Sequence, residues 1–165
     1  MAAITIRELE PSDRRMVAFT FGRLSERSRF QRFFSAKPML TPRDMTRLLD
    51  VDHWHHEALI AFSPPPRAPI GIARYIRLHE FDAAEVAIEV VDGWQRRGVG
   101  TALISALRER AILAGIRHVT VTMLRENRGA RVLAAQLGPI ESAAAQGDVL
   151  ELRFELDKFD LIGGA

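Results

Sequence analysis

The part of this sequence best suited to chemistry is the run Gln-Arg-Arg-Gly-Val-Gly at residues 95–100, which lies between an apolar, strand-like segment and the start of a helix. Gly98 and Gly100 can adopt backbone angles that other residues avoid, and their lack of a side chain lets a ligand approach the main chain closely. The first N–H groups of the following helix attract anions, and the helix dipole adds to this attraction. We therefore predict a main-chain site for a diphosphate at residues 96–101.

Other phosphate-binding motifs fit this run less well. A nucleotide P-loop ends in Gly-Lys-Ser/Thr, whereas here Gly100 is followed directly by Thr101. A dinucleotide fingerprint needs glycine or alanine at its third conserved position, where this chain has Leu103. Neither motif therefore explains the pattern, and an ordinary strand-to-helix turn remains as the alternative to a phosphate site.

Length and composition indicate one domain. The 165 residues are 47% hydrophobic, which is enough to bury a core, so we expect a single domain over residues 1–165. The absence of cysteine excludes disulfides, thiolate metal sites and a cysteine nucleophile, and it favours a cytoplasmic location. Neither a signal peptide nor an apolar run long enough to span a membrane is found, so we expect a soluble protein without a membrane partner.

The charge pattern does not indicate a nucleic-acid partner. The net charge is only +2, and Lys37 and Lys158 are the only lysines among the 23 basic residues. Arginine suits the recognition of phosphate and carboxylate groups. The arginines are spread along the chain, however, and no nucleic-acid-binding motif accompanies them, so we predict no nucleic-acid partner.

Before the glycine run, the hydrophobic periodicity predicts a strand, three helices and an antiparallel meander. Ser12, Ser25 and Thr41 are the candidate N-caps of the three helices. A proline-rich loop joins the first two strands of the meander, and the third strand leads into the glycine run. The predicted strands are Ala3 to Arg7, Ala58 to Phe62, Ile70 to Leu78 and Ala84 to Val91.

After the glycine run, the pattern predicts two helices that alternate with strands. The first helix has one apolar face and ends at Gly115. His118 to Leu124 should then return parallel to the strand before the run, completing a right-handed crossover. Asn127 is the candidate N-cap of the second helix, Gly138 ends it, and Val149 to Asp157 alternates as a closing strand.

Three neighbouring histidines raise the question of a metal site. His53, His55 and His56 are close in sequence, but no Asp-His-His arrangement repeats at helical spacing, and Glu57 begins a strand. We therefore predict no metal.

Taken in this order, the motifs resemble the GNAT superfamily of N-acetyltransferases over nearly the whole chain. Residues 95–100 are similar to its acyl-coenzyme-A signature, Gln/Arg-x-x-Gly-x-Gly/Ala, and Glu126-Asn127-Arg128 is similar to its second cofactor segment. The resemblance implies an α+β fold (mixed α/β) with a mixed, mostly antiparallel sheet flanked by helices, and acetyl-CoA as the cosubstrate. It implies cofactor contacts at Val90, Val91, Arg96, Arg97, Gly98, Val99, Gly100, Thr101, Asn127 and Ala130.

Three segments, at residues 24–34, 49–52 and 84–87, resemble the acetyltransferase domain of bacterial Pat-type protein lysine acetyltransferases. In those proteins this domain is commonly joined to a cyclic-nucleotide-binding or acyl-CoA-synthetase-like domain, and this sequence contains neither. The resemblance implies an N-acetyltransferase that acts on a primary amine, such as a protein lysine. A small-molecule amine is the alternative acceptor, and both a monomer and a homodimer are compatible with the sequence.

Acetyl transfer to an amine needs a base, because an ammonium group has no lone pair, and it needs N–H donors for the developing oxyanion. Glu85 and Glu89 share one face of the predicted strand, roughly 13 Å apart at ~3.3 Å per residue, which is too far for both to act on one atom. The resemblance implies Glu85 as the base and the N–H of Val91 as the oxyanion donor. Glu89 and a water relay remain alternatives for the base.

The proton donor for the departing thiolate is the weak point of this interpretation. Many GNAT enzymes use a tyrosine in the second cofactor helix, and Ala134 occupies the corresponding position here. The only tyrosine, Tyr75, lies on the meander, so we expect water or Asn127 to assist the thiolate. A non-catalytic acyl-CoA-binding or sensing module is therefore the alternative to an enzyme.

Overall fold

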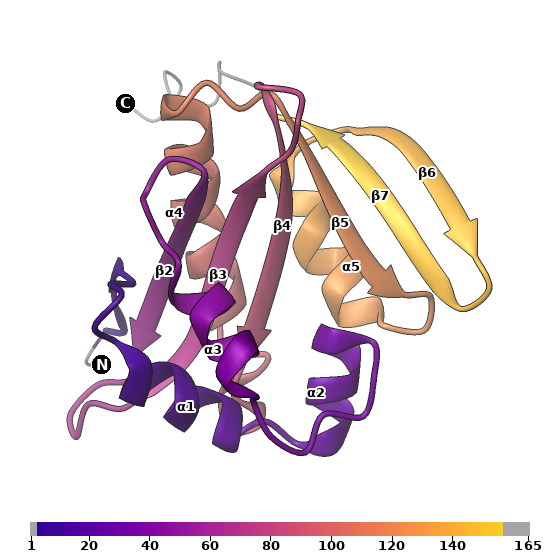
Figure 1. The fold of residues 1–165 in the computed structure, drawn as a ribbon. Coiled ribbons are helices and arrows are strands. Elements are labelled where there is room, and N and C mark those ends of the chain that lie inside the picture. The colour runs from indigo at the N-terminus through magenta and orange to yellow at the C-terminus, as the bar shows by residue number, and fades with distance from the viewer. Residues whose placement is uncertain (1–2, 157–165) are drawn as a thin grey trace.

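A seven-stranded sheet runs through the middle of the protein, with helices on both faces (Figure 1). The computed structural model describes residues 3–156. The strand order is β1-β2-β3-β4-β5-β7-β6, and every neighbouring pair is antiparallel except β4 and β5, which are parallel. The strands are β1 (Thr5–Glu8), β2 (His56–Phe62), β3 (Pro69–Arg77), β4 (Ala83–Val90), β5 (His118–Leu124), β6 (Ile140–Gln146) and β7 (Val149–Glu155).

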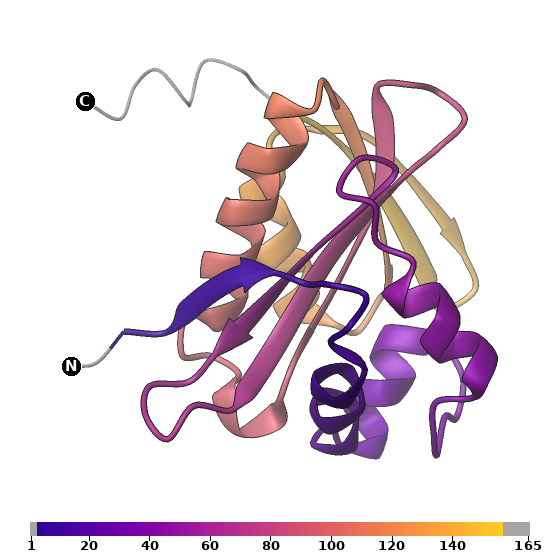
Figure 2. The ribbon, with the colours of Figure 1, turned by 60° about the vertical axis from the view of Figure 1, so that its left-hand side comes forward.

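The helices form two layers, which separate clearly in the rotated view of Figure 2. One layer contains α1, α2 and α3, and the other contains α4 and α5. The bounds are α1 (Arg14–Gly22), α2 (Glu26–Phe33), α3 (Pro42–Leu49), α4 (Val99–Leu113) and α5 (Arg128–Ala134), with short 3-10 turns η1 (Asp92–Trp94) and η2 (Ala135–Leu137). Within residues 3–156, no helix combines the length and apolar character needed to cross a membrane.

This architecture confirms the predicted mixed, mostly antiparallel sheet and the parallel crossover from β4 to β5. Two expectations are corrected. The N-cap of α1 is Asp13 rather than Ser12, and β6 was not predicted because its run of alanines is exposed throughout and shows no alternation. Asp157, where the last strand was expected to end, lies outside the described residues.

Local capping explains where several helices begin. The Ser25 hydroxyl accepts a hydrogen bond from the N–H of Ser28 at 3.1 Å, as predicted for an N-cap of α2. Thr41 and Asp44 form a reciprocal capping box at the start of α3, followed by Pro42 in the first turn. These short-range bonds satisfy N–H groups that a helix cannot satisfy internally.

Two apolar clusters fix the layers on the sheet. The larger cluster lies under α4 and includes Leu103, Leu107 and Phe154, all at most 1% exposed. The smaller cluster joins Val17 of α1 and Met45 of α3 to the opposite sheet face. Burial of such side chains contributes about 1.5–3 kcal/mol each. Unlike α1, α3 and α4, α2 contributes no buried residue.

The parallel strands β4 and β5 part toward their C-terminal ends. Their ladder runs only from Ala83 paired with His118 to Glu85 paired with Thr120. Beyond these pairs the two strands diverge (Figure 1), and α2 lies close to both of them at the opening. The first turn of α4 follows the end of β4, so the opening leads to the glycine run.

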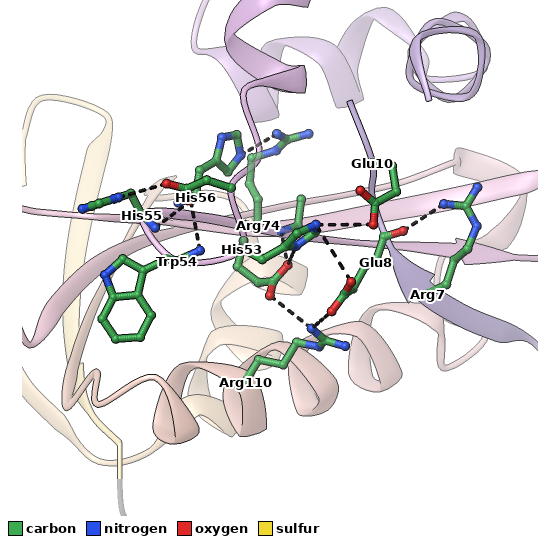
Figure 3. A network of polar contacts seen from close by, with 12 residues as sticks. Arg7, Glu8, Glu10, His53, Trp54, His55, His56, Arg74 and Arg110 are labelled. Carbon is green, nitrogen blue, oxygen red and sulfur yellow. Dashed lines mark hydrogen bonds and ion pairs between the residues drawn. The ribbon is translucent and has the colours of Figure 1, made fainter. Parts of the chain in front are cut away.

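A network of charges ties β1, β2 and α4 together at the far edge of the sheet (Figure 3). Arg110 of α4 donates hydrogen bonds to Glu8 and, at 3.1 Å, to Glu57. Nδ1 of His53 lies 2.7 Å from the other Glu57 oxygen, and its Nε2 lies 3.4 Å from Glu10. The Arg110 hydrogen bond lowers the pKa of Glu8, and the hydrogen bond to Glu57 raises the pKa of His53.

The three histidines considered as metal ligands point to different partners. His53 contacts Glu57, the His55 ring contacts Asp52 at 2.9 Å, and the His56 ring contacts the main-chain oxygen of Asp50 at 2.8 Å. They therefore do not converge on one point. His53 has ligand atoms of Glu8 and Glu10 nearby, all within 4.8 Å of one another, but Arg110 already pairs with Glu8.

The charge network predicts a pH-dependent contribution of His53 to stability. Because the folded-state pKa is raised, the contribution is complete below the unfolded value of about 6.5 and disappears as pH rises through the folded pKa. His53→Gln should therefore reduce the free energy of unfolding more at about pH 5.5 than at about pH 9. Urea unfolding at both pH values measures this difference. His79→Gln, at an exposed histidine, is the control, and an equal loss at both pH values would contradict the prediction.

Candidate active site

The glycine run forms a tight turn whose main-chain N–H groups are available to a ligand. Gly98 has a φ of 85° and is the N-cap of α4. No side chain caps this helix and no acidic residue lies in its first turn, so the N–H groups of Val99, Gly100 and Thr101 have no acceptor from a capping side chain. The Val99 side chain is buried in the core and anchors the turn from below. The arrangement is that of an anion site, and the diphosphate ligand stays a prediction.

The side chains of the run brace the turn. The Arg97 guanidinium lies 4.1 Å from the centre of the Trp94 ring and donates to the Gly93 oxygen at 3.3 Å. Arg96 is exposed and has a φ of 58°. The Thr101 hydroxyl accepts a hydrogen bond from Gln136 at 3.3 Å, which ties the start of α4 to η2. The Arg97 and Thr101 side chains therefore already have partners within the protein, and the main-chain N–H groups are the predicted anion contacts.

The register of β4 corrects the expected oxyanion donor. In an antiparallel ladder, alternate residues bond to the same neighbour, and the N–H of Val91 donates to the Ile70 oxygen of β3 at 2.9 Å. This donor is therefore already used. By the same alternation, the N–H groups of Ile88 and Val90 point away from β3 and toward the opening beside β5. The N–H groups of Ile88 and Val90 can therefore reach a ligand in the opening, whereas the N–H of Val91 cannot.

The second cofactor segment is ordered as a helix start. Asn127 is the N-cap of α5, and its side-chain oxygen accepts a hydrogen bond from the N–H of Ala130 at 3.0 Å. This bond leaves the amide nitrogen of Asn127 as the group that can reach a ligand. Asn127 and Ala130 are both partly exposed, and α5 packs beside α4. Their predicted contacts with the cofactor remain predictions.

The two glutamates of β4 have different environments. Both lie on the sheet face that carries α1, α2 and α3, but Glu85 is exposed, whereas Glu89 is only 7% exposed. One Glu89 oxygen lies 3.3 Å from Nε of Arg32 on α2. An exposed carboxylate can meet an incoming amine, while a buried, paired carboxylate fixes structure. The geometry therefore favours Glu85 over Glu89 as the base.

A buried arginine lies on the same sheet face as these glutamates. Arg74 on β3 is 3% exposed, donates to the Leu48 oxygen at 2.9 Å and contacts the His56 ring at the same distance. Burial lowers the pKa of Arg74 to about 10, while the charge of Glu89 acts in the opposite direction. Burial also lowers the pKa of His56, which favours the neutral ring beside this guanidinium.

The structure offers no tyrosine near the opening among the described residues. Tyr75 is 1% exposed in the core beneath α4, and burial raises its pKa to about 12. Ala134, at the position where a tyrosine was expected by resemblance, is also buried. Neither position 75 nor position 134 therefore supplies a side chain that could protonate a leaving thiolate.

Sequence reasoning did not find the side chains that connect α2 to the glycine run. Asp92 accepts hydrogen bonds from Ser25 and Ser28, although these residues are 67 and 64 positions away in sequence. Gln95 donates to both Ser28 and the Val90 oxygen. Ser25 was predicted only as a helix cap, and no local pattern indicates its distant partner.

Comparison with known proteins identifies relatives of this architecture. The model of a family described as acetyltransferase (GNAT) matches residues 26–138. A curated relative, acetyltransferase Pat of Mycolicibacterium smegmatis, is 31% identical over 94 residues, which represent 56% of this chain and 28% of the relative. The match therefore spans less than a third of that protein.

Solved structures with a similar fold also come from acyltransferases. The GNAT domain of S. lividans PAT has a TM-score of 0.83 and 26% identity, and the match covers 92% of this chain and 89% of that one. A point variant of a cAMP-binding acyltransferase from Mycobacterium smegmatis has a TM-score of 0.65 and 25% identity, covering 97% of this chain and 46% of that one. This chain therefore corresponds to about half of the second protein.

The geometry of the turn predicts that a substitution at Gly98 weakens ligand binding more than it lowers stability. Its φ of 85° is unfavourable for a residue with a side chain, although an added Cβ would meet nothing within 4 Å. Gly98→Ala should cost only about 1 kcal/mol of stability but redirect the N–H groups, weakening coenzyme A binding about tenfold or more. Calorimetric titration measures the affinity. Gly93→Ala, with an equally open site and no positive φ, is the control, and equal affinities would contradict the prediction.

Proposed function

Because this chain belongs to the GNAT family of acetyltransferases, which use acetyl-CoA, we propose that it transfers the acetyl group directly to a primary amine, with a protein lysine as the favoured acceptor. The observation that carries this proposal is the opening between β4 and β5, which joins the exposed Glu85 to the N–H groups of the glycine run. The similarity to Pat and to the GNAT domain of S. lividans PAT supports the choice of acceptor.

The proposed donor site uses mainly the main chain. The N–H groups at the start of α4 would hold the diphosphate, because they are free of side-chain caps. The N–H groups of Ile88 and Val90, which face the opening, would bond the acyl arm along β4. Asn127 would contact the arm from the side of α5 through its amide nitrogen. Bound there, acetyl-CoA supplies the activated acyl carbon.

In the proposed reaction, Glu85 removes a proton from the ammonium form of the acceptor. The amine nitrogen then forms a bond to the acyl carbon, while an N–H of Ile88 or Val90 stabilises the negative charge on the carbonyl oxygen. The carbon–sulfur bond breaks, and the thiolate leaves with the bonding electron pair. The nitrogen, which still carries one proton more than the amide product, loses it through water to the thiolate, because Tyr75 and Ala134 cannot supply a proton.

A second function is favoured by one observation, the alanine at position 134. A protein that binds acetyl-CoA without transferring the acetyl group could act as a sensing module. It would show tight binding by calorimetry and no free thiol with any amine.

The role of Glu85 can be tested directly. Glu85→Gln should lower kcat about 100-fold with Nα-acetyllysine amide as acceptor, because the amide cannot accept the proton. Acetyl-CoA affinity should stay within about twofold, since Glu85 does not line the proposed donor site. Release of free thiol measures the rate, and calorimetry measures the affinity. Glu109→Gln, at an exposed position on α4, is the control. An unchanged rate between about pH 6 and 9 would exclude Glu85 as the base.

The acceptor class can be identified with labelled acetyl-CoA. Incubation with a cell lysate should label lysine side chains of one or a few proteins, detected by mass spectrometry of tryptic peptides. Heavy label that accumulates instead in small amines would contradict a protein acceptor. A Glu85→Gln reaction run in parallel separates enzymatic labelling from spontaneous acetylation.

A further inference from the structure

Helix α2 is held at the opening almost without apolar burial. None of its residues is buried, although it lies near both β4 and β5 and on the same sheet face as the exposed Glu85. α2 therefore lies on the side of the sheet from which an amine would reach Glu85 in the proposed reaction. Polar contacts must therefore determine the position of α2.

The main polar contacts come from one carboxylate. Asp92, which directly precedes the glycine run, accepts hydrogen bonds from the N–H and the hydroxyl of Ser25, both at 2.8 Å, and from the hydroxyl of Ser28 at 3.1 Å. These serines form the first turn of α2, where Ser25 is also the N-cap. The side chain of Asp92, next to the glycine run, thus fixes the start of α2.

Gln95 adds a second link from the same loop. Its side-chain nitrogen donates to the Ser28 hydroxyl at 3.2 Å and to the Val90 oxygen at 2.9 Å. Val90 lies at the end of β4, where its N–H faces the opening. Gln95 therefore joins the first turn of α2 to the part of β4 that borders the proposed acyl arm.

The other end of α2 is held differently. Arg32 pairs with the buried Glu89 at 3.3 Å, and the Phe33 ring packs edge-on against Phe21 of α1, with ring centres 5.9 Å apart. Arg29 also donates to the Phe21 oxygen at 3.2 Å. The C-terminal half of α2 is therefore fixed to β4 and α1, whereas its first turn depends on Asp92 and Gln95.

We propose that Asp92 is a positioning residue that couples the acyl-CoA loop to the acceptor side of the site by holding the first turn of α2. This inference rests on the proposed function. Because Asp92 directly precedes the glycine run, its bonds to Ser25 and Ser28 hold the first turn of α2 at a fixed place beside the opening, with or without the cofactor. Partial burial of Asp92 opposes its ionisation, but the hydrogen bonds from both serines outweigh this and lower its pKa.

Asp92→Asn is the sharpest test, because it preserves size and the acceptor for the Ser25 N–H but replaces the oxygen that both hydroxyls use. Amide hydrogen exchange of residues 25–33 in the protein alone should become about tenfold faster, while exchange in α4 stays unchanged. The KM for Nα-acetyllysine amide should rise about tenfold, with kcat and the acetyl-CoA dissociation constant within about twofold. A general loss of structure would instead raise exchange throughout.

Two further variants make the test specific. Ser28→Ala removes only the hydrogen bonds of Ser28 with Asp92 and Gln95. Because the two bonds from Ser25 to Asp92 remain, it should produce both effects in the same direction but to a smaller extent. Asp50→Asn, at an exposed aspartate after α3, should change neither. Wild-type exchange in α2, or a wild-type acceptor KM, in Asp92→Asn would overturn the inference. If the wild-type protein releases no thiol, the proposed enzyme activity fails, and the exchange rates still decide whether Asp92 holds α2.

Discussion

The parting of β4 from β5 is the constraint on which the site depends. A strand inside a sheet normally bonds to neighbours on both sides, because main-chain N–H and C=O groups need partners. The ladder from β4 to β5 ends at Glu85, however, and Val90 lies well beyond that point. Gln95 supplies a bond to the Val90 oxygen. The remaining groups on that edge of β4 can be bonded by an extended ligand, which would complete the sheet locally.

Helix α5 packs closely against α4 behind the opening. Leu133 of α5 reaches the main chain of α4 at Gly100, where an added Cβ would lie 3.0 Å from the leucine and 3.9 Å from Ile88 of β4. The second glycine of the run is therefore needed for close packing behind the opening, while Gly98 is needed for its backbone angle. On the far side, β5 pairs with β7 along its whole length, whereas its pairing with β4 ends at Thr120. One short motif thus serves both ligand access and the shape of the sheet.

Local features of the sequence predicted much of this structure. The caps Ser25, Thr41 and Asn127 act within three residues, so their effect is visible in the sequence. Strand β6 escaped prediction because its alanines are exposed and lack a period of two. The N–H of Val91, predicted as the oxyanion donor, bonds to Ile70 of β3, because the direction of an N–H group depends on the strand register, which sequence periodicity does not specify. The contact of Asp92 with Ser25 depends on tertiary packing in the same way.

The two sides of the site are held by forces of different strength, and this has a functional consequence. The donor side rests on core residues such as Val99 and Leu103, whose burial fixes α4 firmly. The acceptor side rests on α2, whose exposed hydrogen bonds each contribute only about 0.5–1.5 kcal/mol. Elements with little buried apolar surface open most easily. Under the proposed function, adjustment to an incoming amine should therefore concentrate in α2, while the main-chain groups at the start of α4 keep their positions. If α2 borders the acceptor as proposed, side-chain changes in it should alter acceptor choice without disturbing the core.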